Sequence, residues 1–401
     1  MHKDTDWITK VIEEVGNTAM SHGEYWRASY TKEDDAAVCL LKKYMEEAGM
    51  DTYFDAVGNL FGRLQGKSDD LIMSGSHRDT VRQGGKYDGI LGVLTALKAA
   101  ASLYAQYGSP KKTLEIAAMC EEESSRFPIS YLGSHHICGS FSQDLLQTRD
   151  YNGITLSQAL TEAGYQPCPL SDGRKNLRHF IELHIEQGGV LEEKRKQVGL
   201  VSSVVGLYSW EITFSGHQNH AGTTPMYMRK DPMPVAAQFI CELYQWAYHY
   251  MNDMVCTVGK ITAQPGNGNV IADSVMFTVD IRSENEERLQ QADIEIRKLA
   301  EKLTGKIGIS VLSTSEEPPV HLDKNGLSLL EKLAKERQFA YHIMPSGAGH
   351  DSQVIAQKYP VNMIFVPSVD GISHNTAEYT RPEDIEAGYF LLRDFLKELA
   401  W

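Results

Sequence analysis

Short apolar runs alternate with stretches in which apolar residues repeat at helical spacing, and this alternation predicts the fold. The apolar runs, typical of buried strands, lie at 71–73, 113–119, 180–185 and 361–366. Helical spacing marks residues 5–50 and the segment that begins at Ile90. Strands that alternate with helices predict an α/β fold with a mostly parallel sheet and helices on both faces.

A region in the middle of the chain has a different order of elements. Strands are expected at 207–214, 254–262, 274–281 and 307–312, and helices at 232–250 and 284–303. The order β-α-β-β-α-β is that of a ferredoxin-like α+β unit. Because 401 residues exceed one ordinary core, we predict two domains. One comprises residues 1–207 and 317–401, and the other, residues 208–316, is inserted into it.

Composition narrows the class of protein. Charged residues make up 23% and hydrophobic residues 42%, which is ordinary for a soluble protein. A net charge of -14 argues against nucleic acid or an anionic membrane as a partner. We find neither a membrane-spanning run nor a signal-peptide core. Scattered cysteines without a C-x-x-C pair predict reduced thiols and a cytoplasmic location: Cys39, Cys120, Cys138, Cys168, Cys241 and Cys256.

The stretch SGSHRDTVRQGGKYDGILGV, residues 74–93, joins a predicted strand to a predicted helix. His77 ends the strand, a glycine-rich loop follows, and Asp88 stands where the N-cap of the helix is expected. In isolation His77 could be an ordinary buried histidine and Asp88 only a cap. The loop lacks the spacing of a Walker motif and of Gly-x-Gly-x-x-Gly, which disfavours a phosphate site.

Further imidazoles and carboxylates stand at or just beyond predicted strands. Parallel strands would bring these ends into one crevice, and the residues are His77, Asp88, Glu123, His184 and His374. Such donors suit zinc, manganese or a similar divalent ion. Five are too many for one catalytic zinc, but they suit two ions that share a carboxylate. Asp79 is a candidate to orient the His77 ring.

The acidic run Glu121-Glu122-Glu123 has two interpretations. Charge runs are usually solvated turns. This run ends a buried strand, however, where three carboxylates are costly unless cations neutralise them.

Several motifs together resemble the M20 superfamily of metal-dependent amidohydrolases. More narrowly, the chain resembles the branch with allantoate amidohydrolase, N-carbamoyl-L-amino-acid hydrolase and β-ureidopropionase. The motifs run in family order from Gly75 to Asn375: GSHRDTVRQGGKYDG, EEESSRFP, ELHIEQG, NHAGTTPM, VDIRS, SGAGHD and GISHN. ELHIEQG is typical of this branch, because most M20 peptidases have an acidic residue in place of His184.

The resemblance implies a role for each matching residue. Asp88 would bridge two metal ions, with His77 and His184 on one ion, and Glu123 and His374 on the other. Glu122 would be the general base and then the acid toward the leaving nitrogen.

The resemblance also implies substrate contacts. Gln187 would contact the ureido group, and His220 and Asn269 would face the developing oxyanion. Arg282 would bind the substrate carboxylate through its two-pronged guanidinium. The family's inserted domain serves as lid and dimer interface, which implies a homodimer.

Some alternatives stay open. Arg282 could form only a surface ion pair, and His217 is expected to be a solvated loop residue. The SGAGHD stretch with Gly349 could offer backbone N–H groups to an anion, or be only a tight turn. Ser124 departs from the family, which has glycine there; if that position needs a positive φ, serine is strained.

The sequence therefore predicts a hydrolase with two divalent ions (Zn or Mn, with Co also suitable) that acts on a ureido acid. Allantoate is the first candidate substrate, and N-carbamoyl-L-amino acids are the second. A non-catalytic ureido-acid binding protein on the same fold is the third interpretation, which the retained Glu122 argues against.

Overall fold

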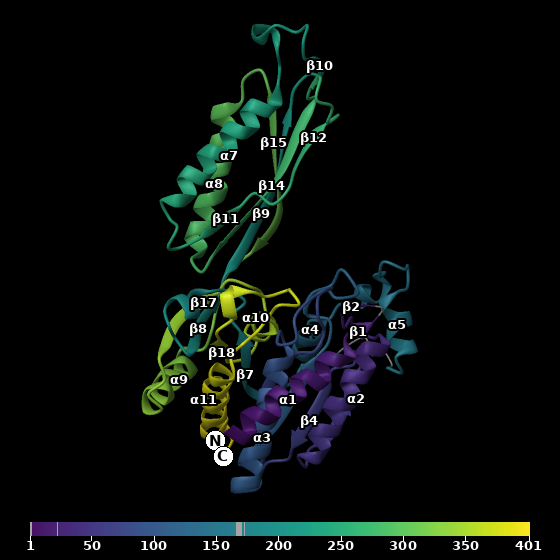
Figure 1. Cartoon of the computed structure of the whole chain (residues 1–401), viewed down its shortest axis with the longest axis vertical. Helices are drawn as coiled ribbons and strands as arrows, with labels where there is room; N and C mark the ends of the chain where they lie inside the picture. The colour runs from purple at the N-terminus through teal and green to yellow at the C-terminus, as the bar shows by residue number, and fades with distance from the viewer. Residues whose placement is uncertain (1, 22, 166–170, 172) are drawn as a thin grey trace. The chain divides into compact units, whose positions relative to one another are not determined.

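The computed structural model describes residues 2–21, 23–165, 171 and 173–401. The chain divides into two compact units (Figure 1). Unit 1 comprises Met1–Ser202 and His321–Trp401, and unit 2 comprises Ser203–Val320. The inserted unit is therefore wider at both ends than the 208–316 expected from the sequence.

Unit 1 is built on one sheet with the strand order β16-β8-β18-β7-β5-β6-β4-β3, and β17 also pairs with β8. The four central strands, β18, β7, β5 and β6, are parallel, as the alternating pattern predicted. Antiparallel strands flank them on both sides. The strands are β3 (Asp51–Phe54), β4 (Leu60–Leu64), β5 (Ser68–His77), β6 (Lys112–Met119), β7 (Leu177–Ile185), β8 (Val198–Val204), β16 (Val320–His321), β17 (Tyr341–Ser346) and β18 (Val361–Val366).

Helices cover both faces of this sheet. On one face α3 and α11 pack on the central strands, and α1 packs on α3 and α11. On the other face α10 contacts β7 and β18, and α4 contacts α10. The helices are α1 (His2–Thr18), α2 (Lys32–Glu47), α3 (Ile90–Tyr107), α4 (Leu132–Cys138), α5 (Leu156–Glu162), α6 (Val190–Glu193), α9 (Lys324–Glu336), α10 (Asp351–Ile355) and α11 (Pro382–Ala400), with 3-10 turns η1 (Gln143–Gln147) and η3 (Val369–Gly371).

Strand β7 shows how the sheet separates core from chemistry. Ile181, Leu183 and Ile185 alternate into the main hydrophobic core, because successive side chains of a strand point to opposite faces. Glu182 and His184 consequently lie on the other face, where Glu182 Oε2 accepts the Ser352 N–H of α10 at 3.3 Å. A short hairpin, β1 (Met20–Ser21) with β2 (Glu24–Tyr25), stands apart from this sheet.

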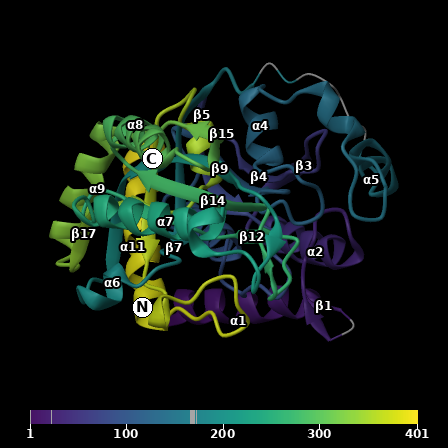
Figure 2. The ribbon, with the colours of Figure 1, turned by 90° about the horizontal axis from the view of Figure 1, so that it is seen from above.

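Unit 2 has an antiparallel sheet in the order β11-β14-β9-β15, with β12 also paired to β14. Helices α7 and α8 pack on one face of it (Figures 1 and 2). The elements are β9 (Gly206–Ser215), β10 (Asn219–His220), η2 (Met226–Met228), α7 (Pro232–Tyr248), β11 (Val255–Thr257), β12 (Ile261–Gln264), β13 (Val270–Ile271), β14 (Ser274–Ser283), α8 (Glu286–Leu303) and β15 (Gly308–Glu317).

The single strand expected at 254–262 is divided into β11 and β12. Thr257 pairs with Asp280 and Ile261 pairs with Phe277, so four steps on one strand face three on β14. One extra residue of this kind is a β-bulge, which interrupts the ladder.

Two further observations concern the whole described chain. Among these residues no helix has the length and apolarity needed to cross a membrane. Five cysteines are free thiols, namely Cys39, Cys120, Cys138, Cys241 and Cys256. Cys168 lies outside the described residues.

Candidate metal centre

The predicted ligands of unit 1 come together at the carboxyl ends of the four parallel strands. His77 is the last residue of β5, and His184 is the penultimate residue of β7. Glu123 follows β6, and His374 follows β18 and η3. Adjacent parallel strands end at the same edge of a sheet, which explains why residues so distant in sequence meet.

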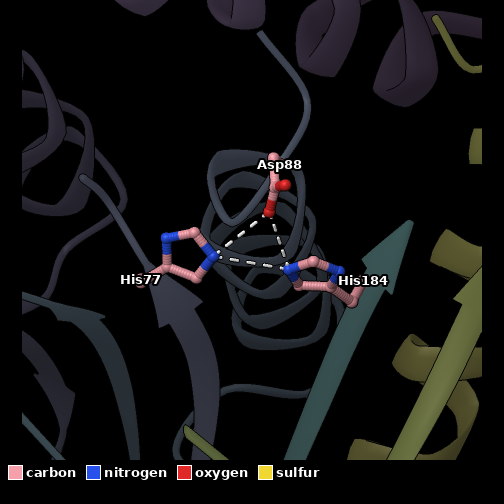
Figure 3. Close-up of side chains that lie close together, drawn as sticks. All are labelled: His77, Asp88 and His184. Carbon is pink, nitrogen blue, oxygen red and sulfur yellow. Dashed lines mark hydrogen bonds and ion pairs between the residues drawn. The ribbon is translucent and has the colours of Figure 1, made fainter. Parts of the chain in front are cut away.

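Three of these side chains form a buried group around one oxygen of Asp88 (Figure 3). Asp88 Oδ1 lies 3.2 Å from His77 Nε2 and 3.1 Å from His184 Nε2. The two Nε2 atoms lie 3.4 Å apart. All three side chains are almost completely buried, with 1–3% of their surface exposed.

The hydrogen bonds of the two rings favour a cation between them. His77 Nδ1 lies 3.0 Å from the Asp79 carbonyl, and His184 Nδ1 lies 2.9 Å from the Ile185 carbonyl. Carbonyl oxygens only accept, so in a neutral ring each Nδ1 carries the proton and each Nε2 carries a lone pair. Two lone pairs and a carboxylate oxygen then converge, and Asp88 Oδ1 has no hydrogen-bond donor in the described chain. This donor set fits a divalent cation.

The pKa shifts of His77, His184 and Asp88 also favour a positive charge at this position. Burial lowers the pKa of His77, but nearby carboxylates, Glu122 and Asp88 foremost, outweigh burial and raise it well above the ordinary value. Burial also lowers the pKa of His184, but Asp88 outweighs burial, and the pKa of His184 is raised. Burial would raise the pKa of Asp88, but the surrounding imidazoles hold it well below the usual range. Either protons or a metal ion must supply the charge.

A second group uses the other oxygen of Asp88. His374 Nε2 lies 3.3 Å from Asp88 Oδ2 and 3.1 Å from Glu123 Oε1. Hydrogen bonding to Asp88 and Glu123 raises the pKa of His374 to about 10. The His374 side chain is 46% exposed. One carboxylate thus faces two ligand groups, a buried one and an open one, as two ions with a bridging ligand require.

Asp79 contacts the His77 ring, as expected, and has a second role through its carboxylate. Its carboxylate oxygens accept the main-chain N–H groups of Glu122 and Glu123 at 3.1 and 3.2 Å. The His77 ring is held by the Asp79 carbonyl, while the nearest carboxylate oxygen lies 3.8 Å away. Asp79 therefore positions the acidic run and, through its main chain, the imidazole.

Glu122 and Glu121 have separate environments in the acidic run. Glu122 is buried with His77 and Glu123 close by, and burial raises its pKa well above the ordinary value. The Glu121 carboxylate accepts the N–H groups of Arg126 and Phe127 at 2.9 and 2.6 Å. Burial raises the pKa of Glu121 to about 8. Glu121 thus holds the loop, and Glu122 is free to face the ligands.

The expectation that Asp88 caps the following helix is wrong. Helix α3 begins at Ile90, its N-cap is Gly89, and no side chain caps it. The Asp88 carboxylate is turned toward the imidazoles instead. Gly89 has φ 68, and a Cβ there would come within 2.5 Å of the His77 ring, so glycine is needed for the turn and for the ring.

Gln187 lies beside the second ligand group. Its Nε2 donates to Asp88 Oδ2 at 2.9 Å and lies 3.4 Å from His374 Nε2. Within the described residues its Oε1 has no hydrogen-bond partner. Gly349 lies in the turn between β17 and α10, where Ser346 Oγ accepts the Ala348 N–H at 3.2 Å.

The structure adds two residues that sequence reasoning missed. His350 is buried, its ring meets that of His184 edge to face at 4.6 Å, and burial lowers its pKa well below the ordinary value. Glu378 is buried next to Asp88, and burial raises its pKa to about 7. The position of His350 directly after the Gly-Ala-Gly turn was a signal for the first. No local pattern marks the second.

The predicted substrate residues of unit 2 form two separate groups. The main chains of His220 and Asn269 are neighbours, because Ala221 N donates to Asn269 O at 3.0 Å. His220 Nδ1 accepts the N–H groups of Gly222 and Thr223 at 3.0 and 3.2 Å. A neutral ring then carries its proton on Nε2 and can donate from there.

Arg282 stands near the other end of the same sheet. It lies on β14, and its guanidinium bonds Asp280 at 3.0 and 3.3 Å. His220 and Asn269 lie beyond Ser274, at the start of β14. The eight steps from Ser274 to Arg282 span roughly 26 Å of strand, so within one unit 2 the two groups are far apart.

Ser124 does occupy a positive-φ position, with φ 51, where the resembling family has glycine. A non-glycine residue in this region costs roughly 1–3 kcal/mol. The Ser124 hydroxyl lies 2.8 Å from that of Ser130, an exposed contact that offsets little of the strain.

Replacing Ser124 with glycine is therefore expected to increase the free energy of unfolding by about 1 kcal/mol, after the entropy that glycine adds to the unfolded chain. Calorimetry should show a higher Tm. Ser130→Ala is the matched control, because it removes the hydroxyl contact and leaves φ at residue 124 unchanged. A Tm for Ser124→Gly at or below that of the parent protein would show that the position is not strained.

Comparison with known proteins agrees with this geometry. Residues 73–398 match peptidase family M20/M25/M40. The allantoate amidohydrolase of Bacillus subtilis is 41% identical over 98% of this chain and 97% of its own. The N-carbamoyl-L-amino-acid amidohydrolase of Paenarthrobacter aurescens is 35% identical over 98% of this chain and 97% of its own. A crystal structure of an amidase of the hydantoinase/carbamoylase family from Burkholderia multivorans has TM-score 0.91 and 32% identity, and covers 99% of this chain and 98% of its own.

The fold and the shared aspartate define an α/β protein with candidate ligand groups for divalent metal at the carboxyl edge of a parallel sheet. The chain belongs to peptidase family M20/M25/M40, which confirms the superfamily inferred from the motifs.

Proposed function

We propose that this protein is a binuclear-metal amidohydrolase that cleaves a linear C–N bond of a ureido acid. The observation that carries the proposal is Asp88, whose two oxygens serve two ligand groups beside the buried carboxyl of Glu122. The similarity to allantoate amidohydrolase supports the reaction class.

His77 and His184 would hold one ion, and Glu123 and His374 the other, with Asp88 between them. When bound, the two ions would make water nucleophilic near neutral pH and polarise the scissile carbonyl. Imidazole and carboxylate donors suit Zn²⁺, Mn²⁺ or Co²⁺. Glu122 would take the proton of the attacking water and pass it to the leaving nitrogen.

The remaining residues would bind the substrate. Gln187, already beside Asp88 and His374, would turn its amide to the ureido group. The Nε2–H of His220, with Asn269, would donate to the developing oxyanion. Arg282 would hold the substrate carboxylate, and the backbone around Gly349 would assist.

We further propose a homodimer in which unit 2 is the lid and the interface. Arg282 and the His220–Asn269 pair lie too far apart in one unit 2 to contact the same small molecule. If both groups act on one substrate, they come from two copies of the chain. A cytoplasmic location fits the free thiols of the described cysteines.

Allantoate is the proposed substrate, giving ammonia, carbon dioxide and a ureidoglycine- or ureidoglycolate-type product. An N-carbamoyl-L-amino acid is the second candidate, because relatives with that activity are also similar along nearly the whole chain.

The test is an ammonia-release screen of metal-replete protein against allantoate, ureidoglycolate, carbamoyl-β-alanine and several carbamoyl amino acids. We expect the highest kcat/KM with allantoate, no activity after chelation, and recovery with Mn²⁺, Co²⁺ or Zn²⁺. A preference for a carbamoyl amino acid would assign the second function. Bound metal without ammonia from any of these compounds would leave only a binding protein.

A further inference from the structure

The glycine-rich loop before Asp88 donates main-chain N–H groups to a carboxylate of the same chain. Glu378 Oε1 accepts the main-chain N–H of Tyr87 at 2.9 Å and that of Asp88 at 3.0 Å. Glu378 is 5% exposed. Glycine loops often offer their amides to phosphate, but here a carboxylate from 290 residues further along the chain takes two of them.

The contact of Gly85 with Glu378 explains why this position of the loop requires glycine. A Cβ at residue 85 would lie 1.9 Å from Glu378 Oε1 and 2.1 Å from its Cδ. Real Cβ atoms do not approach other heavy atoms so closely. Any other residue at position 85 would therefore push the Glu378 carboxylate out of its place.

The second oxygen of Glu378 reaches the segment that carries His374. Glu378 Oε2 lies 3.0 Å from Ser373 Oγ, which also lies 3.2 Å from Asp88 Oδ2. One buried side chain thus links the loop of the shared aspartate to the loop of an imidazole ligand. In addition, the rings of Tyr87 and Tyr379 pack edge to face at 5.8 Å.

We propose that Glu378 is a positioning residue that fixes how Asp88 divides its two oxygens between the two metal ions. This inference rests on the binuclear centre proposed above. Glu378 contacts Asp88 only through its main chain and through Ser373, so it acts on the ions indirectly, as partners behind metal ligands commonly do.

The effect of Glu378 should fall mainly on one ion. His77 and His184 lie at buried strand ends, and their rings are held by carbonyls of unit 1 that do not involve Glu378. His374 lies on a loop directly after Ser373. Its φ angle is 52, and its side chain is 46% exposed. An ion held by Asp88, Glu123 and His374 would therefore depend on the link, and an ion held by His77 and His184 would not.

The experiment measures metal content and the two affinities for Mn²⁺ and Zn²⁺ separately, on the full chain. The parent protein should bind two ions. Glu378→Ala should bind one of them about 10–100-fold more weakly, the loss typical for partners of metal ligands, and keep the other affinity. The weakened affinity of Glu378→Gln should lie between that of the parent protein and that of Glu378→Ala. The amide oxygen of glutamine can still accept both N–H groups while its Nε2 donates to Ser373.

Gly85→Ala provides a second variant that leaves every ligand and Glu378 itself in the sequence. Its methyl group displaces the carboxylate, so the same single affinity should weaken. Asp150→Ala is the matched control: Asp150 is also a buried carboxylate that accepts two N–H groups, those of Asn152 and Ile154, at 2.9 Å each. It should lower the Tm without changing either metal affinity.

The outcomes separate this inference from the proposed function. A parent protein that does not bind two ions would contradict the binuclear centre. Two ions in the parent, with both affinities unchanged in Glu378→Gln and Gly85→Ala, would contradict the role of Glu378 alone. Equal weakening of both ions would indicate a general structural effect and would also overturn the inference.

Discussion

Replacing Glu122 with glutamine is expected to lower kcat by about 10²–10⁴-fold, the range typical of general acid–base catalysis. Glutamine keeps the length and shape of the side chain but cannot take a proton from water. Burial raises the pKa of Glu122, which suits a group that must accept a proton and then release it to the leaving nitrogen. Because Glu122 is not among the proposed ligands, the variant should still bind two metal ions.

Glu121→Gln is the matched control for this variant. Glu121 is the neighbouring residue and is also buried, but its carboxylate binds the N–H groups of the 126–127 turn. Loss of this carboxylate should mainly lower the Tm and should change kcat little. Steady-state kinetics and metal analysis of both variants decide the assignment. If Glu122→Gln retained kcat within a few-fold of the parent, the base would have to be another group.

The sequence predicted that the candidate ligands cluster, because the apolar pattern and the position of the ligands have one cause. Apolar runs identify the parallel strands, and such strands end at one edge. Residues at or just beyond the ends of the runs, such as Glu123 and His184, were therefore expected to gather in one crevice, and both lie in groups that share Asp88. The antiparallel pairing of β8 with β18 and of β4 with β6 was not foreseen, because an apolar run does not reveal the direction of its neighbours.

The errors have a common origin in tertiary contacts. Asp88 stands where a cap is expected, but two imidazoles attract its carboxylate, and Gly89 begins the turn. Asp79 was expected to orient the His77 ring and does so through its carbonyl, but the sequence did not reveal that its carboxylate accepts two main-chain N–H groups. Glu378 could not be foreseen at all, because its partners at Tyr87 and Asp88 are close only in the folded chain.

The separation of the substrate residues in unit 2 also became visible only in the structure. Motif order places His220, Asn269 and Arg282 within one predicted domain, but it does not indicate their distance. The register of β14 places Arg282 roughly 26 Å of strand from Ser274. This distance turns the dimer from an expectation of family resemblance into a requirement, if both groups bind one substrate.

A heterodimer with one defect in each subunit should therefore recover activity for one pair of defects and not for the other. Two differently tagged chains, Glu122→Gln with His220→Ala, or Glu122→Gln with Arg282→Ala, are coexpressed and purified through both tags. Each homodimer should have much lower activity: Glu122→Gln loses the base, Arg282→Ala loses the carboxylate contact, and His220→Ala loses an oxyanion donor, which costs about 10²–10³-fold in kcat. If a group acts across the interface, the mixed dimer has one site with both defects and one site with none, so about half of the parent activity returns.

If the His220–Asn269 pair and Arg282 bind one substrate, we expect only one of the two pairs to recover. The two groups would then come from different copies, so one would act within its own subunit and the other across the interface. A heterodimer of Glu122→Gln with His184→Ala is the control, because both changes affect unit 1 of their own subunit and each site keeps one defect. Recovery by both test pairs, or by neither when the heterodimer is proven by mass, would contradict a site shared between subunits and would leave the chemistry at Asp88 and Glu122 intact.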